Sequence, residues 1–305
     1  MKKYLKIAVS VTLLGVLLYK INWNKMYGHI NMSDLPLISF VFIIFVFQFP
    51  ISAYRWKKSL EIHELIFPFL SLQKILCMGF FINTFLPTSI GGDGYRALKT
   101  TPGTGDKSRG ISAILLERIL GFLVLIFLGL IGAIVILRKY PTPAIKMYIL
   151  GVFLFGIFLF FGKILLKNIT FGRFLSGTRW MNIIDVIQCN LQYIKNDRRN
   201  LLQVVGYSIA FQFLAITAIH LLFMVVGVET GIADCAFIAA FAGIATLLPI
   251  SINGIGVVEG SLVFSALQVG IVYDQAVIVA LMFRILTVPL TLTCGLIYLY
   301  EVART

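Results

Sequence analysis

The chain has 305 residues, of which 59% are hydrophobic and only 13% are charged. A soluble domain is about 45–50% apolar and about 25% charged, so this composition excludes an ordinary soluble enzyme, a nucleic-acid-binding domain and a disordered chain. We therefore assign the net charge of +13 to loops that face anionic headgroups of the inner leaflet, and not to binding of nucleic acid.

Six stretches are long and apolar enough to cross a bilayer as helices, since a span needs about 20 such residues. The first has lysines before its apolar core but no small-x-small cleavage site, so we interpret it as a retained span and not as a signal peptide. The predicted spans are residues 5–21, 35–54, 108–137, 145–166, 200–227 and 275–299.

Two further apolar segments, 71–86 and 234–248, behave differently. At about 1.5 Å per residue each reaches only about 24 Å, which is short of a comfortable crossing. Each then breaks at a proline that glycines follow, at Pro87 and at Pro249. Irregular backbone survives at membrane depth only inside protein or beside a watery cavity, so we predict two re-entrant helical hairpins. The alternative is a short tilted span followed by an ordinary external loop.

The basic residues indicate the orientation. With both termini in the cytoplasm, most of the 26 Lys and Arg residues lie on the cytoplasmic side, including Arg55, which we place just after the second span. This predicts a multi-pass protein of the plasma membrane. The longest cytoplasmic loop, 167–199, ends in a pattern typical of an amphipathic helix on the inner leaflet or, equally, of a solvated linker helix.

Two short sequences recur in the same order and at nearly equal spacing: Leu86-Pro87-Thr88-Ser89-Ile90 with Leu248-Pro249-Ile250-Ser251-Ile252, and Arg118-Ile119-Leu120 with Arg284-Ile285-Leu286. We interpret 1–305 as a single transmembrane domain of two repeats, 1–137 and 145–301. An odd number of spans separates the hairpins, so the repeats must point in opposite directions. The predicted fold is an all-α polytopic membrane protein with six full spans and two re-entrant hairpins in an inverted repeat, an arrangement that transporters use to build a substrate site.

Charged residues inside the predicted membrane region are costly, by about 2.5–3.5 kcal/mol on insertion scales, and are usually functional. Helical rise places Arg118 and Arg284 near the middle of their spans. Both could pair with acids that merely fix the fold, and a Glu259–Arg284 or Glu259–Arg118 pair would do so. We favour a functional role for these arginines and for Arg96, because the acids at depth are too few to neutralise them.

Glu117 is left open between a structural and a functional role. Asp93 and Arg96 lie three residues apart, so a helix would place them on one face.

The Gly91-Gly92 turn before Asp93 suits a phosphate, because converging backbone N–H groups and a helix N-terminus attract anions. Gly254 and Gly256 can do the same from the other side, although each turn can also be only a tight turn. The candidate headgroup-binding residues are Asn83, Ser89, Gly91, Gly92, Asp93, Arg96, Glu117, Arg118, Asn253, Gly254, Gly256, Glu259 and Arg284. Scattered Cys and His residues and the lack of a nucleotide motif indicate no metal and no cofactor.

Three motifs in order resemble the lysylphosphatidylglycerol synthase transmembrane-region family, the flippase-like domain of bacterial and archaeal membrane proteins: Asn83-x-x-Leu86-Pro87-x-x-x-Gly91-Gly92-Asp93-x-x-Arg96, Glu117-Arg118-x-x-Gly121 and Pro249-x-x-x-x-Gly254-x-Gly256-x-x-Glu259. The resemblance covers about 35–300, with Asn253 where the family often has glycine. It implies a polytopic protein that moves a lipid between leaflets, often a modified phospholipid or a lipid-linked sugar. The synthase activity is not expected, since the sequence ends at Thr305, just after the last span.

The leading hypothesis is a lipid flippase or scramblase whose arginines hold the headgroup phosphate in turn, while Glu117 and Glu259 reset them. Its partner is a membrane phospholipid or a lipid-linked sugar. A second hypothesis is an intramembrane transferase acting on a lipid-linked sugar, with Asp93 or Glu259 as general base. A third is an ion-coupled transporter of a small anion.

Overall fold

The computed structural model describes residues 34–85, 90–101, 107–167, 197–246 and 253–304, together with a few isolated positions. Across these ranges the chain forms helices and no strand. The helices are α3 (Leu35–Ile62), α4 (Phe69–Phe85), α5 (Ile90–Lys99), α6 (Lys107–Ile136), α7 (Pro143–Lys167), α10 (Arg198–Val225), α11 (Ile232–Ala245), α12 (Val257–Gln268) and α13 (Tyr273–Arg304). The predicted span 5–21 and nearly all of the loop 167–199 lie outside the described residues, as do Pro87, Ser89 and Pro249.

Four of these helices are long and apolar enough to cross a membrane: α3, α6 from Arg109 onward, α10 and α13. A helix satisfies its own backbone hydrogen bonds, so long runs of Leu, Ile and Phe can stay in hydrocarbon. The multi-pass membrane character is thereby confirmed, whereas the full set of six spans stays a prediction. For α7, side chains are described only as far as Gly156.

The helix that contains the predicted span 35–54 extends beyond it, because α3 continues to Ile62. Arg55, which we placed in a cytoplasmic loop, lies inside this helix and is buried. Arg and Lys are good helix formers, so the charges that end the apolar run do not end the helix.

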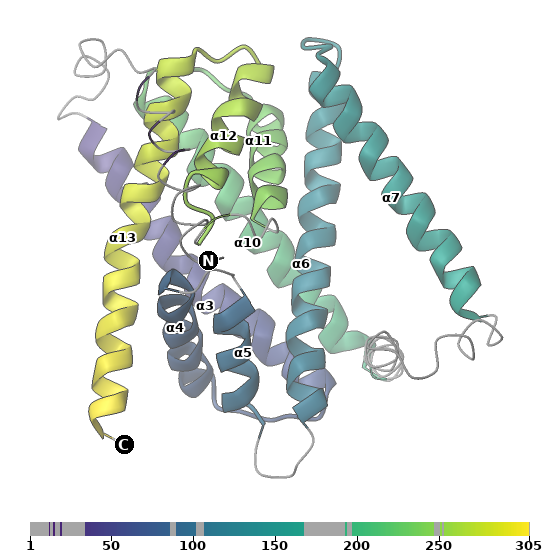
Figure 1. The fold of residues 1–305 in the computed structure, drawn as a ribbon, viewed down its shortest axis with the longest axis vertical. Helices are drawn as coiled ribbons and strands as arrows, with labels where there is room; N and C mark the ends of the chain where they lie inside the picture. Colours follow the sequence, from purple (N-terminus) through teal and green to yellow (C-terminus); the bar gives the residue numbers. More distant parts are fainter. Residues whose placement is uncertain are drawn as a thin grey trace.

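The long helices form a frame into which two shorter helical pairs fit (Figure 1). Helices α3 and α10 pack against each other, and α6 and α13 run along the bundle beside them. The pair α4–α5 occupies the lower half of Figure 1 and the pair α11–α12 the upper half, and each returns to the end from which it came. Helix α7 packs on α6 and leans away from the rest.

Helix contacts correspond between the two halves. Helix α4 packs on α5 and on α13, and α11 packs on α12 and on α6. The α6–α11 contact and the α4–α13 contact each join one half to the other, and each contains a glycine that leaves no room for a side chain. A Cβ on Gly129 would lie 2.2 Å from the Cβ of Ala240, and one on Gly295 would lie 2.6 Å from the ring of Phe81. The residue spacing that relates Arg118 to Arg284 also relates Gly129 to Gly295. Small residues let helix backbones approach closely where no hydrophobic effect drives them together.

A further match between the halves lies in the central helices. Phe47-Gln48-Phe49 in α3 recurs as Phe211-Gln212-Phe213 in α10. The side-chain amide of Gln48 donates to the carbonyl of Phe211 (3.5 Å), and that of Gln212 donates to the carbonyl of Gly121 in α6 (3.4 Å). These amides therefore join helices through polar contacts between apolar surfaces.

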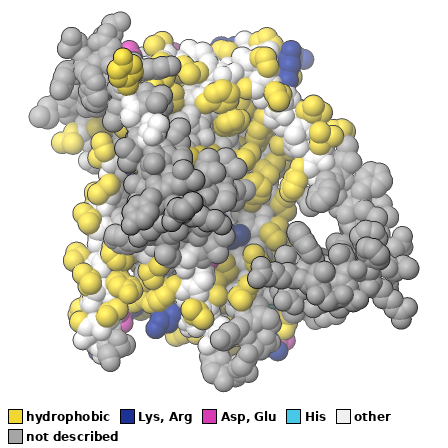
Figure 2. Space-filling view, viewed as in Figure 1, with side chains coloured by type: hydrophobic (Ala, Val, Ile, Leu, Met, Phe, Trp, Pro, Cys, Tyr) yellow, Lys and Arg dark blue, Asp and Glu magenta, His cyan; other side chains and the backbone are white. Residues whose placement is uncertain are grey.

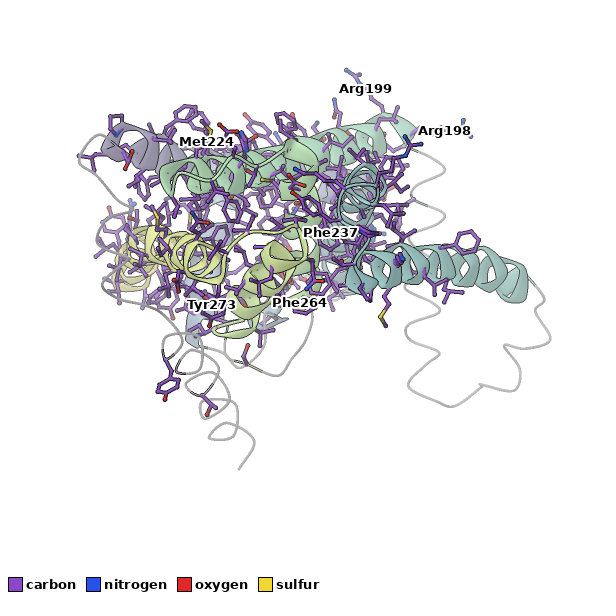
Figure 3. The ribbon with its side chains drawn as sticks, turned by 90° about the horizontal axis from the view of Figure 1, so that it is seen from above. Arg198, Arg199, Met224, Phe237, Phe264 and Tyr273 are labelled. Carbon is purple, nitrogen blue, oxygen red and sulfur yellow. The ribbon has the colours of Figure 1, made fainter. Side chains whose placement is uncertain are left out.

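Hydrophobic side chains cover the visible described surface along its whole length, and Lys and Arg lie mostly toward its ends (Figure 2). Seen from above, Arg198 and Arg199 lie at the outer end of α10, away from the bundle (Figure 3). Phe237 of α11 is fully buried and packs edge-on against Tyr148 of α7 (5.5 Å between ring centres). The exterior is thus suited to lipid, and polar groups inside the bundle need partners there.

Candidate functional site

A buried carboxylate lies at the centre of the first half. Glu117 of α6 has a side chain that is 1% exposed. Arg55 of α3 donates to its Oε1 from Nη2 (2.7 Å) and Nε (3.1 Å). Arg96 of α5 donates from Nη2 to its Oε2 (2.5 Å). Both carboxylate oxygens are therefore occupied, and a single side chain joins three helices.

The hydrogen bonds continue from Arg96 toward the surface. Its Nη1 donates to Oδ1 of Asp93 (3.1 Å), one helical turn earlier in α5. Asp93 also accepts from Nη2 of Arg118, at 2.9 Å to Oδ1 and 2.8 Å to Oδ2. The Arg118 side chain is 51% exposed. We call Arg55, Glu117, Arg96, Asp93 and Arg118 the charge chain; it runs from a buried end to an exposed one.

Aromatic rings and a glycine shape the buried end of the charge chain. The guanidinium of Arg96 lies over the ring of Trp56 (4.1 Å to the centroid), and that of Arg55 lies over Phe211 (5.2 Å). A Cβ on Gly121 would lie 3.1 Å from Nη1 of Arg55. A cation over an aromatic face is stabilised most where water is excluded. The glycine of the Glu117-Arg118-x-x-Gly121 motif thus leaves room for an arginine from another helix.

The start of α5 is held by α4. Asn83 accepts a hydrogen bond at Oδ1 from the backbone N–H of Gly92 (2.6 Å). A Cβ on Gly92 would lie 2.1 Å from the carbonyl oxygen of Gly79, so the two helices touch backbone to backbone. This contact fixes the first turn of α5, which includes Gly91, and thereby positions Asp93 and Arg96.

The second half has a smaller polar cluster at the start of α12. Arg284 of α13 donates from Nε to Oε1 of Glu259, whose side chain is 3% exposed. The other oxygen, Oε2, accepts from the backbone N–H of Gly256 (2.8 Å), as in a helix-capping box. The Arg284 side chain is 27% exposed.

The segment before α12 adopts left-handed backbone conformations at Asn253 (φ 49°), Gly254 (φ 70°) and Gly256 (φ 82°). Glycine adopts this region freely, and Asn tolerates it better than most residues do. Asn253 is therefore compatible with this turn, as glycine would be.

Both halves contain the same type of ion pair. The Asp93–Arg118 pair and the Glu259–Arg284 pair each join residues that are 25 apart in sequence. In each, the acid lies in the first turn of the short second helix and the arginine lies on the long helix that follows.

The expectation that the acids at depth are too few for Arg96, Arg118 and Arg284 is wrong for these three arginines taken alone, and the shortage arises only when Arg55 is counted. Each has a carboxylate partner: Arg96 has Glu117 and Asp93, Arg118 has Asp93, and Arg284 has Glu259. Of the two pairs considered for Glu259, the one with Arg284 is present. The extra cation is Arg55, which a hydropathy argument misses because a charge cluster after an apolar run normally marks the end of a span. A Glu facing from another span was the one available signal.

The structure therefore brings together two groups of the predicted residues. Asn83, Gly91, Gly92, Asp93, Arg96, Glu117 and Arg118 belong to the first half, and Asn253, Gly254, Gly256, Glu259 and Arg284 to the second. Among the described residues, no three His, Cys, Asp or Glu side chains cluster as metal ligands would.

Comparison with known proteins gives a single finding. A family model described as "Lysylphosphatidylglycerol synthase TM region" matches residues 4–295. No curated protein and no solved structure shows a significant match to the chain. The matched region contains both ion pairs and the whole charge chain.

Proposed function

We propose that this chain, which belongs to the lysylphosphatidylglycerol synthase transmembrane-region family, is a flippase or scramblase that moves a phosphate-bearing lipid between leaflets. Lipid metabolism or transport is what the family indicates; the movement itself is our proposal. Our proposal also places the protein in the plasma membrane with both termini in the cytoplasm.

In this proposal α4–α5 and α11–α12 are re-entrant hairpins of an inverted repeat. Figure 1 supports this, because α4–α5 begins and ends at the lower end of the bundle and α11–α12 begins and ends at the upper end. The correspondence of helix contacts between the halves supports it as well. Backbone that leaves a helix is tolerated at membrane depth only inside protein or beside a watery cavity. Transporters built this way bind substrate where the broken helices meet.

One observation carries the proposal: each half presents an arginine whose carboxylate partner is more deeply buried than the arginine itself. Arg118 and Arg284 are 51% and 27% exposed, whereas Asp93 and Glu259 are 18% and 3% exposed. Guanidinium groups bind phosphate with paired hydrogen bonds. A headgroup phosphate can therefore approach each arginine from its exposed side and replace the carboxylate as its hydrogen-bond partner. When the lipid leaves, the ion pair with the carboxylate forms again. The acyl tails stay in the surrounding lipid throughout.

The test is a leaflet-accessibility assay with a fluorescent phospholipid in reconstituted vesicles. Arg118→Ala and Arg284→Ala are each expected to slow lipid movement by about tenfold or more, since a hydrogen bond to a charged group contributes about 1.5–3 kcal/mol. Lys74→Ala is the matched control, because Lys74 forms an exposed pair with Glu301 (2.5 Å) outside both clusters. Equal rates for the wild type and Arg118→Ala would reject the arginine relay.

The structure offers no observation in favour of the transferase hypothesis. Asp93 and Glu259, the candidate general bases of that hypothesis, are each paired with arginine in the described structure, which is the arrangement that our proposal uses instead. We therefore propose no enzymatic role. A lipid species missing from a deletion strain would favour the transferase, and transport of phosphate without lipid would favour the small-anion transporter.

A further inference from the structure

The charge chain is not neutral. It contains three arginines and two carboxylates, so it carries one surplus positive charge (Arg55, Arg96 and Arg118 against Glu117 and Asp93). Within the described parts of the molecule these five groups bond to one another and to no other charged side chain. The Glu259–Arg284 cluster, by contrast, balances one cation with one anion.

The difference between the halves comes from three positions. The spacing that relates Arg118 to Arg284 places Leu262 where the first half has Arg96, and Phe283 where it has Glu117. The spacing of the Phe-Gln-Phe match places Ile219 where the first half has Arg55. The second half has thus the exposed ion pair without the buried charges behind it.

A surplus cation surrounded by apolar side chains is unfavourable unless an anion neutralises it. Neither carboxylate can do so, because each is already shared between two arginines. The surplus reaches solvent-accessible surface only at Arg118, since Arg55, Arg96 and Glu117 are buried. Because Arg118 is the most exposed member of the charge chain, an anion from outside the described residues can reach the surplus charge there.

The charge of this anion determines which lipid it belongs to. A phosphodiester lipid with one net negative charge cancels the surplus when it binds. A zwitterionic lipid brings its own cation and leaves the sum unchanged. The Glu259–Arg284 cluster can receive either lipid, because its one negative and one positive charge already balance.

We propose that the first half is an anionic-headgroup site and that the second half is a transit site, so that the protein selects net-anionic over zwitterionic phospholipids. Arg55 sets this selectivity without touching the lipid, through Glu117, Arg96 and Asp93. The proposal rests on the proposed function for the fate of the bound lipid, but the headgroup preference is measurable as binding alone.

Trp56 provides a probe, because its ring lies 4.1 Å from the Arg96 guanidinium. In a Trp23→Phe, Trp180→Phe background it is the remaining one of the 3 tryptophans. The experiment follows its fluorescence in detergent-purified full-length protein during titration with dihexanoyl-phosphatidylglycerol, dihexanoyl-phosphatidylcholine or sodium phosphate. The same proteins are then reconstituted, and movement of anionic and zwitterionic fluorescent lipids is measured.

We expect phosphatidylglycerol to bind about tenfold more tightly than phosphatidylcholine, a difference of about 1.4 kcal/mol. Arg55→Gln, which removes the surplus charge and keeps a donor for Glu117, should reduce this ratio to about twofold or less. Arg55→Lys keeps the charge and should keep the preference for phosphatidylglycerol. If Arg55 had only a structural role, both substitutions would change the affinity ratio about equally. A thermal unfolding curve of each variant shows that it is folded.

Equal binding of the two lipids to the wild type would overturn the inference, whatever the variants do. Free phosphate binding as tightly as phosphatidylglycerol would overturn the lipid identity and indicate a soluble anion. Anionic preference in binding without lipid movement in vesicles would instead overturn the proposed function and leave the headgroup site in place.

Discussion

Glu117 joins α3, α5 and α6 through the two oxygens of one buried carboxylate. Exclusion of water strengthens these ion pairs. It also makes substitution of Glu117 costly, because Arg55 and Arg96 have no other partner acid of comparable burial among the described residues. The residue therefore has a structural role, and in our proposal it also transmits the charge of Arg55 toward the headgroup.

Replacing Glu117 with Gln should destabilise the protein, because it leaves two buried arginines without their shared anion. Breaking a buried ion pair from one side typically costs about 3–5 kcal/mol. The measurement is the thermal unfolding midpoint in detergent. Glu301→Gln, at the exposed pair with Lys74, is the control and should change the midpoint little. A Glu117→Gln midpoint equal to that of the control would mean that the pairing contributes no stability.

The sequence names four of the five residues of this network but predicts few of the bonds between them. Asp93 and Arg96 were expected on one helix face and do form an ion pair (3.1 Å). Arg55 was missed because hydropathy assigns a basic cluster to the loop after a span, whereas here the first basic residue of the cluster turns inward. Which acid binds which arginine depends on the rotation of separate helices, and the sequence pattern does not determine that rotation.

At the scale of elements, backbone contact between α4 and α5 is what places Asp93. The contact requires the absence of a side chain at Gly92. The same short helix has Gly94, where an added Cβ would meet nothing within 4 Å. A comparison of substitutions at Gly92 and Gly94 therefore distinguishes the packing requirement at Gly92 from the general effect of glycine on helix stability.

Gly92→Ala should therefore be damaging and Gly94→Ala tolerated. Overpacking a tight contact costs about 1–3 kcal/mol, and more where backbone must move. Replacing an unconstrained helical glycine by alanine is neutral or stabilising by up to about 1 kcal/mol. Thermal unfolding in detergent and lipid movement in vesicles both test this contrast. If the two variants behave alike, the crossing of α4 and α5 is not as close as the structure places it.

The helices themselves were largely predictable, since the apolar runs at 108–137, 200–227 and 275–299 correspond to α6, α10 and α13 within a few residues. Helices α4 and α11 also end within a few residues of the predicted ends at 86 and 248. What periodicity could not supply is the packing between halves, because helices that are apolar on all sides carry no face that indicates a neighbour. The matching Phe-Gln-Phe segments were a usable signal, and they were missed because they lie inside apolar runs.

At the scale of the whole molecule, the proposed function depends on the relation between the halves. Helix contacts, close-contact glycines and exposed ion pairs recur in both, and the buried charges behind Arg118 do not. In our proposal the halves form an inverted repeat, and a lipid meets a cluster with a surplus positive charge in one half and a balanced cluster in the other. The two pairs must then begin on opposite sides of the membrane.

A matched pair of isoleucines tests this directly. Ile66 precedes α4 and is 86% exposed; Ile232 begins α11 and is 56% exposed, and the spacing of Arg118 and Arg284 relates them. In a background free of the 4 cysteines, we expect a membrane-impermeant thiol reagent to label Ile232→Cys in intact cells and Ile66→Cys only after permeabilisation. The positive-inside rule gives this assignment of sides. Labelling of both positions from one side would place both helical pairs on that side, and a lipid path between opposed tips would then not exist.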